Sequence, residues 1–211
     1  MPKVIVAPGR IQVLEPVSPY DDFVRAFLAT MHDVRGVLIS GYPAILLGRS
    51  RQTEDIDMFL WPMQRAAFVA WYGRLEKAGF WCLNAGVDGA WDLLEHGQAP
   101  RFAKSGNIEP NVEVKIPTER RAREQMDRAW QLDLLGQQGW IGDLSDQVAY
   151  KVFMGTAHER HAKRLPTNKD IEDAAHIARA AHAAIDWDEA HRLASILGVS
   201  ETLWEQFRER S

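Results

Sequence analysis

The stretch that decides the fold reads Ser40-Gly41-Tyr42-Pro43 and, after a helix-length gap, Asp55-Ile56-Asp57-Met58-Phe59-Leu60. The first part predicts a small-residue turn that opens a helix, and the second predicts a short β-strand. Alternate side chains of a strand share a face, so Asp55 and Asp57 point the same way. Two neighbouring carboxylates repel one another and favour a cation beside them. The stretch therefore predicts a functional site.

A second alternating run, Asn111-Val112-Glu113-Val114-Lys115-Ile116, predicts another strand with a third acid, Glu113, on its polar face. A pair of aspartates and a third carboxylate from a neighbouring strand can hold Mg²⁺, which prefers oxygen ligands and shares them with substrate phosphates. Such ions stabilise the attacking and leaving oxygens of a phosphoryl or nucleotidyl transfer. We therefore predict Asp55, Asp57 and Glu113 as catalytic and metal-binding residues. Glu113 would ligate the metal nearer the acceptor or take the proton of the acceptor hydroxyl.

The turn and the segment after it suit a polyphosphate. Gly41 allows the backbone to approach a ligand closely, and the following helix offers free N–H groups to a phosphate. Arg49 and Arg51 lie between that helix and the acidic strand, where they would neutralise phosphate charge. The plainer alternative is that the two aspartates form ion pairs with these arginines, and that Glu113 is a solvent-facing partner of Lys115.

Composition limits the function classes. The chain has 211 residues and a formal net charge of −4, which disfavours nucleic-acid binding through overall charge but allows a local basic patch. One such run, residues 120–123, is predicted to be a solvated helix because acids flank it, and the alternative is an RNA-contacting face. A single cysteine, Cys82, excludes an internal disulfide and fits a reducing compartment. No apolar run is long enough to span a bilayer, and we expect a cytoplasmic protein without membrane contact.

The order of patterns predicts an α+β fold with a mixed β-sheet, flanking helices and a C-terminal helical region. In the first half we expect strands near residues 37–39, 56–60, 80–83, 91–94 and 111–117, and a polar loop over 95–107. Helical patterns dominate after Thr118. We therefore place an α/β domain at 1–117 and a mainly helical region at 118–211, packed on it. His158 and His161 stand one turn apart, but without a third ligand we read them as a polar helix face.

The three parts together resemble the signature of the nucleotidyltransferase fold, that of the polymerase-β-like superfamily. They are Ser40-Gly41, Asp55-Ile56-Asp57 and Val112-Glu113-Val114. The run 48–57 is similar to that of bacterial minimal nucleotidyltransferases, including the AbiEii group, the toxin half of abortive-infection toxin–antitoxin pairs. That group carries a downstream lysine and a Lys/Arg-Asp element, which Lys151 and Asp170 match.

The resemblance implies a Mg²⁺-dependent enzyme that moves a nucleotide from an NTP to an acceptor hydroxyl and releases pyrophosphate. A toxin-like member implies tRNA or a protein as acceptor and an antitoxin-like partner. The implied nucleotide-binding residues are Ser40, Gly41, Arg49, Arg51, Lys151 and Asp170. The alternative is a catalytically idle member of the fold that binds a nucleotide or a partner protein.

Some of these positions also have structural interpretations. Lys151 lies at the edge of an apolar helical stripe and would extend its amine to solvent. Asp170 would complete a capping pattern with Thr167, or would hold Lys151 towards the site. Asp173 is expected to face solvent. Tyr42 occupies the position after the glycine, where it would either stack on a base or crowd a triphosphate.

Overall fold

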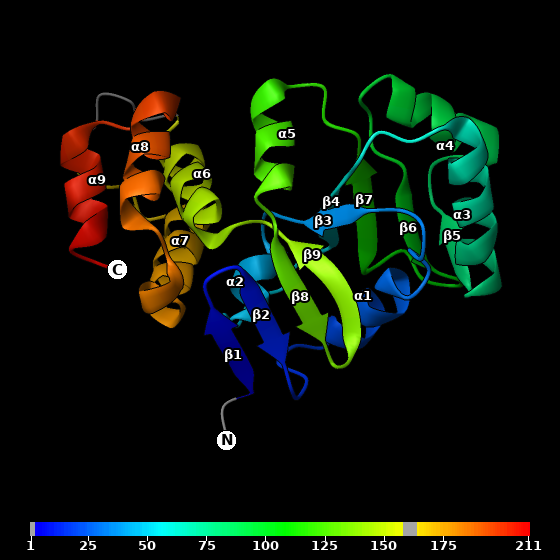
Figure 1. Ribbon diagram of the computed structural model, residues 1–211, viewed down its shortest axis with the longest axis horizontal. Coiled ribbons are helices and arrows are strands. Elements are labelled where there is room, and N and C mark those ends of the chain that lie inside the picture. The colour runs from blue at the N-terminus through cyan, green and yellow to red at the C-terminus, as the bar shows by residue number, and fades with distance from the viewer. Residues whose placement is uncertain (1–2, 158–163) are drawn as a thin grey trace.

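The strands of the described chain form one mixed sheet in the order β1-β2-β8-β9-β3-β4-β7-β6-β5 (Figure 1). The structure is a computed structural model that describes residues 3–157 and 164–211. The strands are β1 Val4–Ala7, β2 Arg10–Val13, β3 Gly36–Leu38, β4 Asp55–Leu60, β5 Phe80–Cys82, β6 Arg101–Lys104, β7 Asn111–Lys115, β8 Trp130–Leu134 and β9 Gln137–Ile141.

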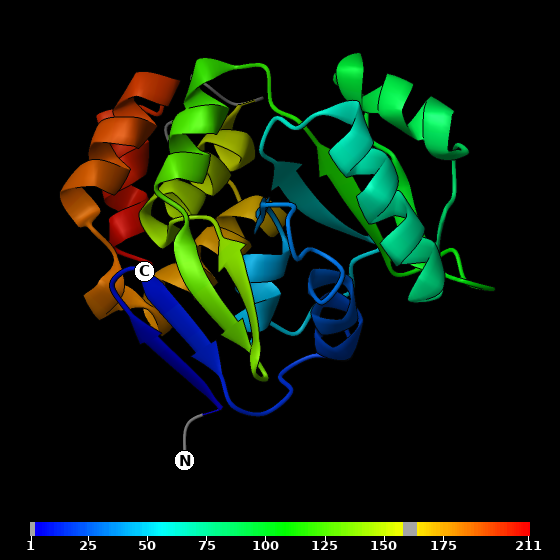
Figure 2. The same ribbon diagram turned by 45° about the vertical axis from the view of Figure 1, so that its right-hand side comes forward.

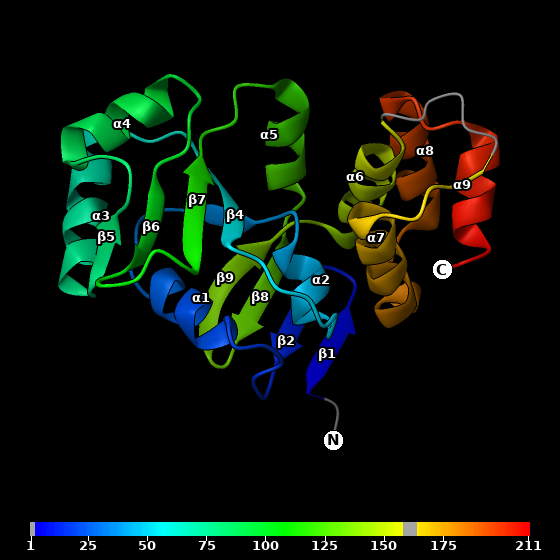
Figure 3. The same cartoon turned by 180° about the vertical axis from the view of Figure 1, so that it is seen from behind.

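Helices cover the sheet and form the C-terminal region (Figures 1 and 3). The bounds are α1 Asp21–Leu28, α2 Tyr42–Leu46, α3 Arg65–Lys77, α4 Val87–Glu95, α5 Arg120–Asp127, α6 Leu144–Thr156, α7 Lys169–Ala180, a 3₁₀ turn His182–Ala184, α8 Trp187–Leu197 and α9 Glu201–Arg208. Seen from behind, α2 lies between the sheet and α7, and His176 of α7 bonds the Leu47 carbonyl at 3.0 Å. No helix in the described ranges is long and apolar enough to cross a membrane.

Strand β4 lies inside the sheet, between β3 (antiparallel) and β7 (parallel). Its side chains alternate as predicted: Ile56, Met58 and Leu60 are buried, whereas Asp55 and Asp57 are half-buried on the opposite face. The predicted α+β fold with a mixed sheet is confirmed. The alternation sets which residues face the site, because register partners on neighbouring strands share a face.

The strands β9 and β3 have the shortest pairing in the described sheet. These parallel strands share one residue pair, Leu38 with Ile141, and the Gly142 amide then donates to the Leu38 carbonyl at 2.8 Å. Towards the start of β3 the two strands have no further pair. Figure 2 shows β8 and β9 diverging from the other half of the sheet, with β1 and β2 beside them.

Some predicted elements were wrong. Residues 91–94 belong to helix α4 rather than a strand, and 101–104 form β6 inside the expected loop. The hairpin of β8 and β9 lies in the region expected to be mainly helical and joins the sheet. The sheet thus draws strands from both sides of residue 117, where the division between the two regions stays a prediction.

Helices α6 and α7 approach closely at Gly155. A Cβ built there would lie 2.7 Å from side-chain carbons of Ile171, and the Gly155 carbonyl accepts a bond from the Asn168 amide at 2.8 Å. Asn168 also caps α7, since its Oδ1 accepts from the backbone of Asp170 and Ile171. This cap replaces the expected one and leaves the Asp170 carboxylate available to another partner.

Candidate active site

Asp57 and Glu113 are direct register partners on the parallel strands β4 and β7. Both line an open cleft of about 440 Å³, whose other walls come from α5 and α6. The turn residue Ser40 lines the same cleft, and so do Lys151 and Asp170. Five of the nine predicted site residues therefore meet at one concave surface, although they come from five separate segments of the chain.

Burial raises the pKa of Asp57 above its ordinary value. A hydrogen bond from the Ser40 side chain lowers it, the neighbouring Asp55 raises it, and the charges of Lys115 and Lys151 lower it. The ionised form of Asp57 is thus disfavoured by desolvation and by a second acid. A cation in the cleft would relieve both effects.

Ser40 is held in an unusual backbone conformation at the end of β3. Its φ is 65°, in the left-handed region that non-glycine residues seldom occupy. The Ser40 amide donates to Oε1 of Gln147 at 3.0 Å, which ties the turn to helix α6. Backbone strain of this kind persists where the surroundings fix it and is concentrated at functional sites.

Glu113 is buried and engaged by two cations. Its Oε1 lies 2.5 Å from Arg101 of β6, and its Oε2 lies 3.9 Å from Lys115. Arg101 and Glu113 are register partners, so the ion pair follows from strand pairing. The expectation that Glu113 faces solvent beside Lys115 was wrong on exposure but right in naming one of its two partners.

Asp55 lies at the start of β4 and lines a separate hollow with Arg51 and Lys169. Within residues 3–157 and 164–211, no three His, Cys, Asp or Glu side chains are grouped to hold a metal ion. His158 and His161 lie outside the described residues. The three predicted acids thus share a sheet face, and Asp57 and Glu113 share the cleft.

Lys151 is buried on α6 and extends to α7 rather than to solvent. Its Nζ donates to Oδ2 of Asp173 at 2.8 Å and to Oδ1 of Asp170 at 3.3 Å. Arg49 Nε lies 2.8 Å from Oδ1 of Asp173, and Arg51 Nε lies 3.7 Å from it. Three cations therefore surround one fully buried carboxylate.

Asp173 was wrongly expected to face solvent. It is 0% exposed, and the helical spacing of Asp170, Asp173, Ala174 and Ile177 could have indicated this, because these positions fall on one face of α7. Glu172, on another face, binds Arg49 Nη2 at 2.8 Å. The alternative in which these arginines pair with the β4 aspartates was wrong, because both arginines pair with acids of α7.

The turn residues Gly41 and Tyr42 both lie against other groups of the protein. A Cβ on Gly41 would lie 1.9 Å from Arg51 Nη2, so the group that approaches this glycine is a guanidinium. Tyr42 is 1% exposed, and its hydroxyl donates to the buried Asp21 carboxylate at 3.0 Å. Tyr42 therefore belongs to the core and neither stacks on a ligand nor crowds one.

The residues present suit a hard divalent cation by chemistry. Asp57 and Glu113 offer carboxylate oxygens from adjacent strands, and Asp55 precedes Asp57 on the same face. Mg²⁺ prefers such ligands and keeps part of its shell for water and phosphate oxygens. A carboxylate whose charge is disfavoured by burial gains most from a cation beside it.

A solved structure with a similar fold is an antigenic nucleotidyltransferase-like protein from Paracoccidioides brasiliensis. The match has a TM-score of 0.55 and 14% sequence identity, and it covers 89% of this chain and 91% of that one. Another match is JHP933 from Helicobacter pylori, with a TM-score of 0.38, 12% identity and coverage of 90% and 93%. No protein-family model and no curated protein matches the sequence. The first likeness shows the fold: an α+β, nucleotidyltransferase-like sheet with flanking helices.

Proposed function

We propose that this protein is a Mg²⁺-dependent nucleotidyltransferase that moves a nucleotide from an NTP to an acceptor hydroxyl. One observation carries the proposal. The register partners Asp57 and Glu113 line a cleft together with Lys151, in a chain whose fold resembles a nucleotidyltransferase-like protein over most of its length. Acids on one wall and a cation within reach of them suit a metal-bound polyphosphate.

Each of the acids and the lysine is given a role in this proposal. Asp55 and Asp57 would hold Mg²⁺, and Glu113 would complete that site or accept the proton of the acceptor hydroxyl. Bound there, the ion supplies positive charge that offsets the charge of the triphosphate. Lys151, on the cleft wall, would contact a phosphate, and Asp170 would keep its amine in place.

The remaining predicted residues would support the phosphate site. Ser40 presents a strained turn and donates to Asp57. Gly41 leaves room for Arg51, and Arg49 and Arg51 anchor the buried carboxylate that also holds Lys151. These arginines would act on the nucleotide through position and long-range charge, since α7 already binds their guanidinium groups.

The finer proposal rests on motif resemblance. The run 48–57, Lys151 and Asp170 resemble those of toxin-like minimal nucleotidyltransferases. We extend the proposal to a toxin-like enzyme of the cytoplasm that modifies tRNA or a protein hydroxyl and is paired with an antitoxin-like partner.

The test is metal-dependent label transfer. The protein is incubated with each α-labelled NTP, Mg²⁺ and either bulk tRNA or total protein, and compared with Asp57→Asn. Asp57→Asn keeps the side-chain shape but removes the charge, and should lose at least about a hundredfold of the transfer rate. Asp88→Asn, an exposed acid of α4, is the matched control and should retain the rate. Transfer that persists in EDTA or in Asp57→Asn would refute the proposal.

A second candidate is a catalytically idle protein that binds a nucleotide or a partner in the same cleft. The ion pair between Glu113 and Arg101 favours it, because that pair neutralises an acid the reaction would use. Arg101→Ala separates the two. An enzyme should keep or gain transfer when Glu113 is released. An idle protein should show NTP binding by calorimetry and no transfer in either form.

A further inference from the structure

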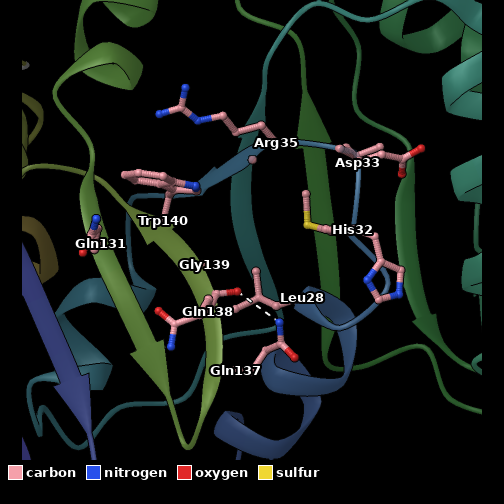
Figure 4. Close-up of a pocket in the computed structure, with 12 residues that line it drawn as sticks. Leu28, His32, Asp33, Arg35, Gln131, Gln137, Gln138, Gly139 and Trp140 are labelled. Atoms are coloured by element: carbon pink, nitrogen blue, oxygen red, sulfur yellow. Dashed lines mark hydrogen bonds between the residues drawn. The ribbon is translucent and has the colours of Figure 1, made fainter.

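Arg35 is held between two tryptophans at the opposite end of β3 from the Ser40 turn. Its guanidinium carbon lies 4.0 Å from the ring centre of Trp61 and 4.5 Å from that of Trp140. Figure 4 shows the Arg35 side chain reaching over the Trp140 indole. Indole is the ring that binds cations best, so two of them fix the orientation of this side chain. We call Arg35, Trp61 and Trp140 the stacking platform.

The platform carries a positive charge that no acid in the described part of the chain neutralises. Arg35 is exposed, and it forms no ion pair with an acid in the described part of the chain, whereas the neighbouring Asp33 is paired with Arg74. A guanidinium whose two faces are stacked still has its N–H groups pointing outward in its own plane. There they can bind a phosphate in a bidentate manner. The platform therefore suits an anion with flat, stackable groups.

A groove of about 470 Å³ borders the platform where β9 and β3 diverge. Arg35 and Trp140 line it, together with the amide side chains of Gln131, Gln137 and Gln138 (Figure 4). Amides both donate and accept hydrogen bonds, as the edges of nucleobases require. The groove thus combines a cation, an aromatic face and base-like hydrogen-bonding groups.

Strand register places the platform on the same sheet face as the acids. Asp57 and Phe59 line the cleft, and Trp61, just beyond the end of β4, continues their alternation. The Trp61 amide donates to the Arg35 carbonyl at 3.0 Å, which continues the antiparallel pairing of β4 with β3. Trp140 directly precedes Ile141, the partner of Leu38, and packs against the Arg35 guanidinium. Trp61 is four positions beyond Asp57, which is about 13 Å along an extended chain.

We infer that the stacking platform and its groove bind single-stranded nucleic acid and lead it along the sheet towards Asp57. Arg35 binds a phosphodiester, the indoles stack on bases, and the glutamines contact base edges. The combination of a basic group with aromatic side chains is what sequence-tolerant single-strand binding uses. The role as a path for the acceptor rests on the proposed function, whereas binding by the platform does not.

The test is fluorescence polarisation with a labelled single-stranded RNA of about twelve nucleotides. EDTA is present and NTP is left out, so that catalysis cannot contribute. Arg35→Ala should weaken binding about tenfold and reduce the slope of log affinity against log salt by about 0.7, the value for one phosphate contact on a single strand. Arg65→Ala, an exposed arginine of α3 paired with Asp88, is the matched control and should bind as the wild type does.

Two further arms separate the ligand classes. Arg35→Lys keeps the charge but loses the stacked fork, and should recover less than half of the lost binding free energy. An abasic oligonucleotide or an acidic peptide of equal charge should compete at least tenfold less well than the RNA. Equal competition by either, or unchanged RNA binding in Arg35→Ala, would overturn the inference.

The proposed function can fail separately. Asp57→Asn removes label transfer but leaves the platform intact, and should bind the RNA as the wild type does. Binding that depends on Arg35 without any transfer would sustain this inference and refute the enzyme. Transfer to tRNA that is unaffected by Arg35→Ala would sustain the enzyme and refute the path.

Discussion

Lys151 of α6 donates to Asp173 of α7 at 2.8 Å, and the side chains of the two residues are 7% and 0% exposed. The pair, with Arg49 and Arg51, joins α7 to the segment between α2 and β4. A single buried carboxylate thus fixes the C-terminal helices against the sheet beside the proposed site.

Asp173→Asn should lower the free energy of unfolding by about 3–5 kcal/mol, because it removes the buried charge that Lys151, Arg49 and Arg51 share. Lys151 and Arg49 would keep only their more exposed partners, Asp170 and Glu172. Urea denaturation followed by circular dichroism measures this. Glu172→Gln is the matched control, since its side chain is half exposed, and should change stability by less than about 1 kcal/mol. Equal effects of the two substitutions would show that the buried network has no special role.

Tyr42→Phe should lower stability by about 1–2 kcal/mol and leave NTP binding unchanged. The substitution removes the bond from the buried phenol to Asp21, while Asp21 keeps its bond from the Ser18 hydroxyl at 2.6 Å. Denaturation and calorimetry with NTP are the two measurements. A changed NTP affinity at unchanged stability would place Tyr42 in the ligand site rather than in the core.

Asp146 should make stability depend on pH. Burial raises its pKa to about 6, and the hydrogen bonds from Nη2 of Arg128 to both carboxylate oxygens oppose this without cancelling it. Because the folded protein binds this proton more tightly than the unfolded chain, the stabilising contribution is full below about pH 4 and is lost as the pH rises through 6. The whole contribution is on the order of 3 kcal/mol.

Asp146→Asn isolates this effect. The difference in unfolding free energy, wild type minus variant, should increase as the pH falls from about 7 to about 4.5. Thermal melts over that range measure it, with Asp88→Asn as the exposed control. A difference that stays constant with pH would show that Asp146 does not titrate there.

Two helical glycines should respond to alanine in opposite directions. Gly155→Ala should destabilise by about 1–3 kcal/mol, because its Cβ would displace Ile171 at the crossing of α6 and α7. Gly73→Ala, inside α3 with open space around it, should stabilise by about 1 kcal/mol through helix propensity. Chemical denaturation of both variants measures the two changes in unfolding free energy. A stabilising Gly155→Ala would mean that α6 and α7 move apart at little cost.

The parts of the fold that local patterns determine could be predicted from the sequence. Strands β4 and β7 alternate strictly, and their register then brings Asp57 and Glu113 together. Helix α4 was missed because a short segment such as 91–94, with three apolar residues and one acid, does not distinguish a strand from a helix. Its buried residues Ala90, Trp91 and Leu94 follow helical spacing. Strand β8 carried a readable signal, since Trp130, Leu132 and Leu134 alternate with polar residues.

Other features depend on pairings that no local pattern encodes. The Arg101 partner of Glu113 required knowing that β6 lies beside β7. The stacking platform joins residues of β9 to residues flanking β3 and β4, which only the completed sheet brings together. Spacing within an element was informative, whereas neighbours across elements had to be seen in the structure.

The pairing of β2 with β8 has a consequence for biosynthesis. Gln12 and Asp133, which touch across these strands, are 121 positions apart in the chain. A ribosome works from the N-terminus, so the β1–β2 hairpin must wait with one open edge until β8 has emerged. The strands β3 to β7 pair with one another, and all of them are synthesised before β8. Their pairing within this group therefore needs no such delay. We expect the nascent protein to form that half of the sheet first and to close over the N-terminal hairpin last.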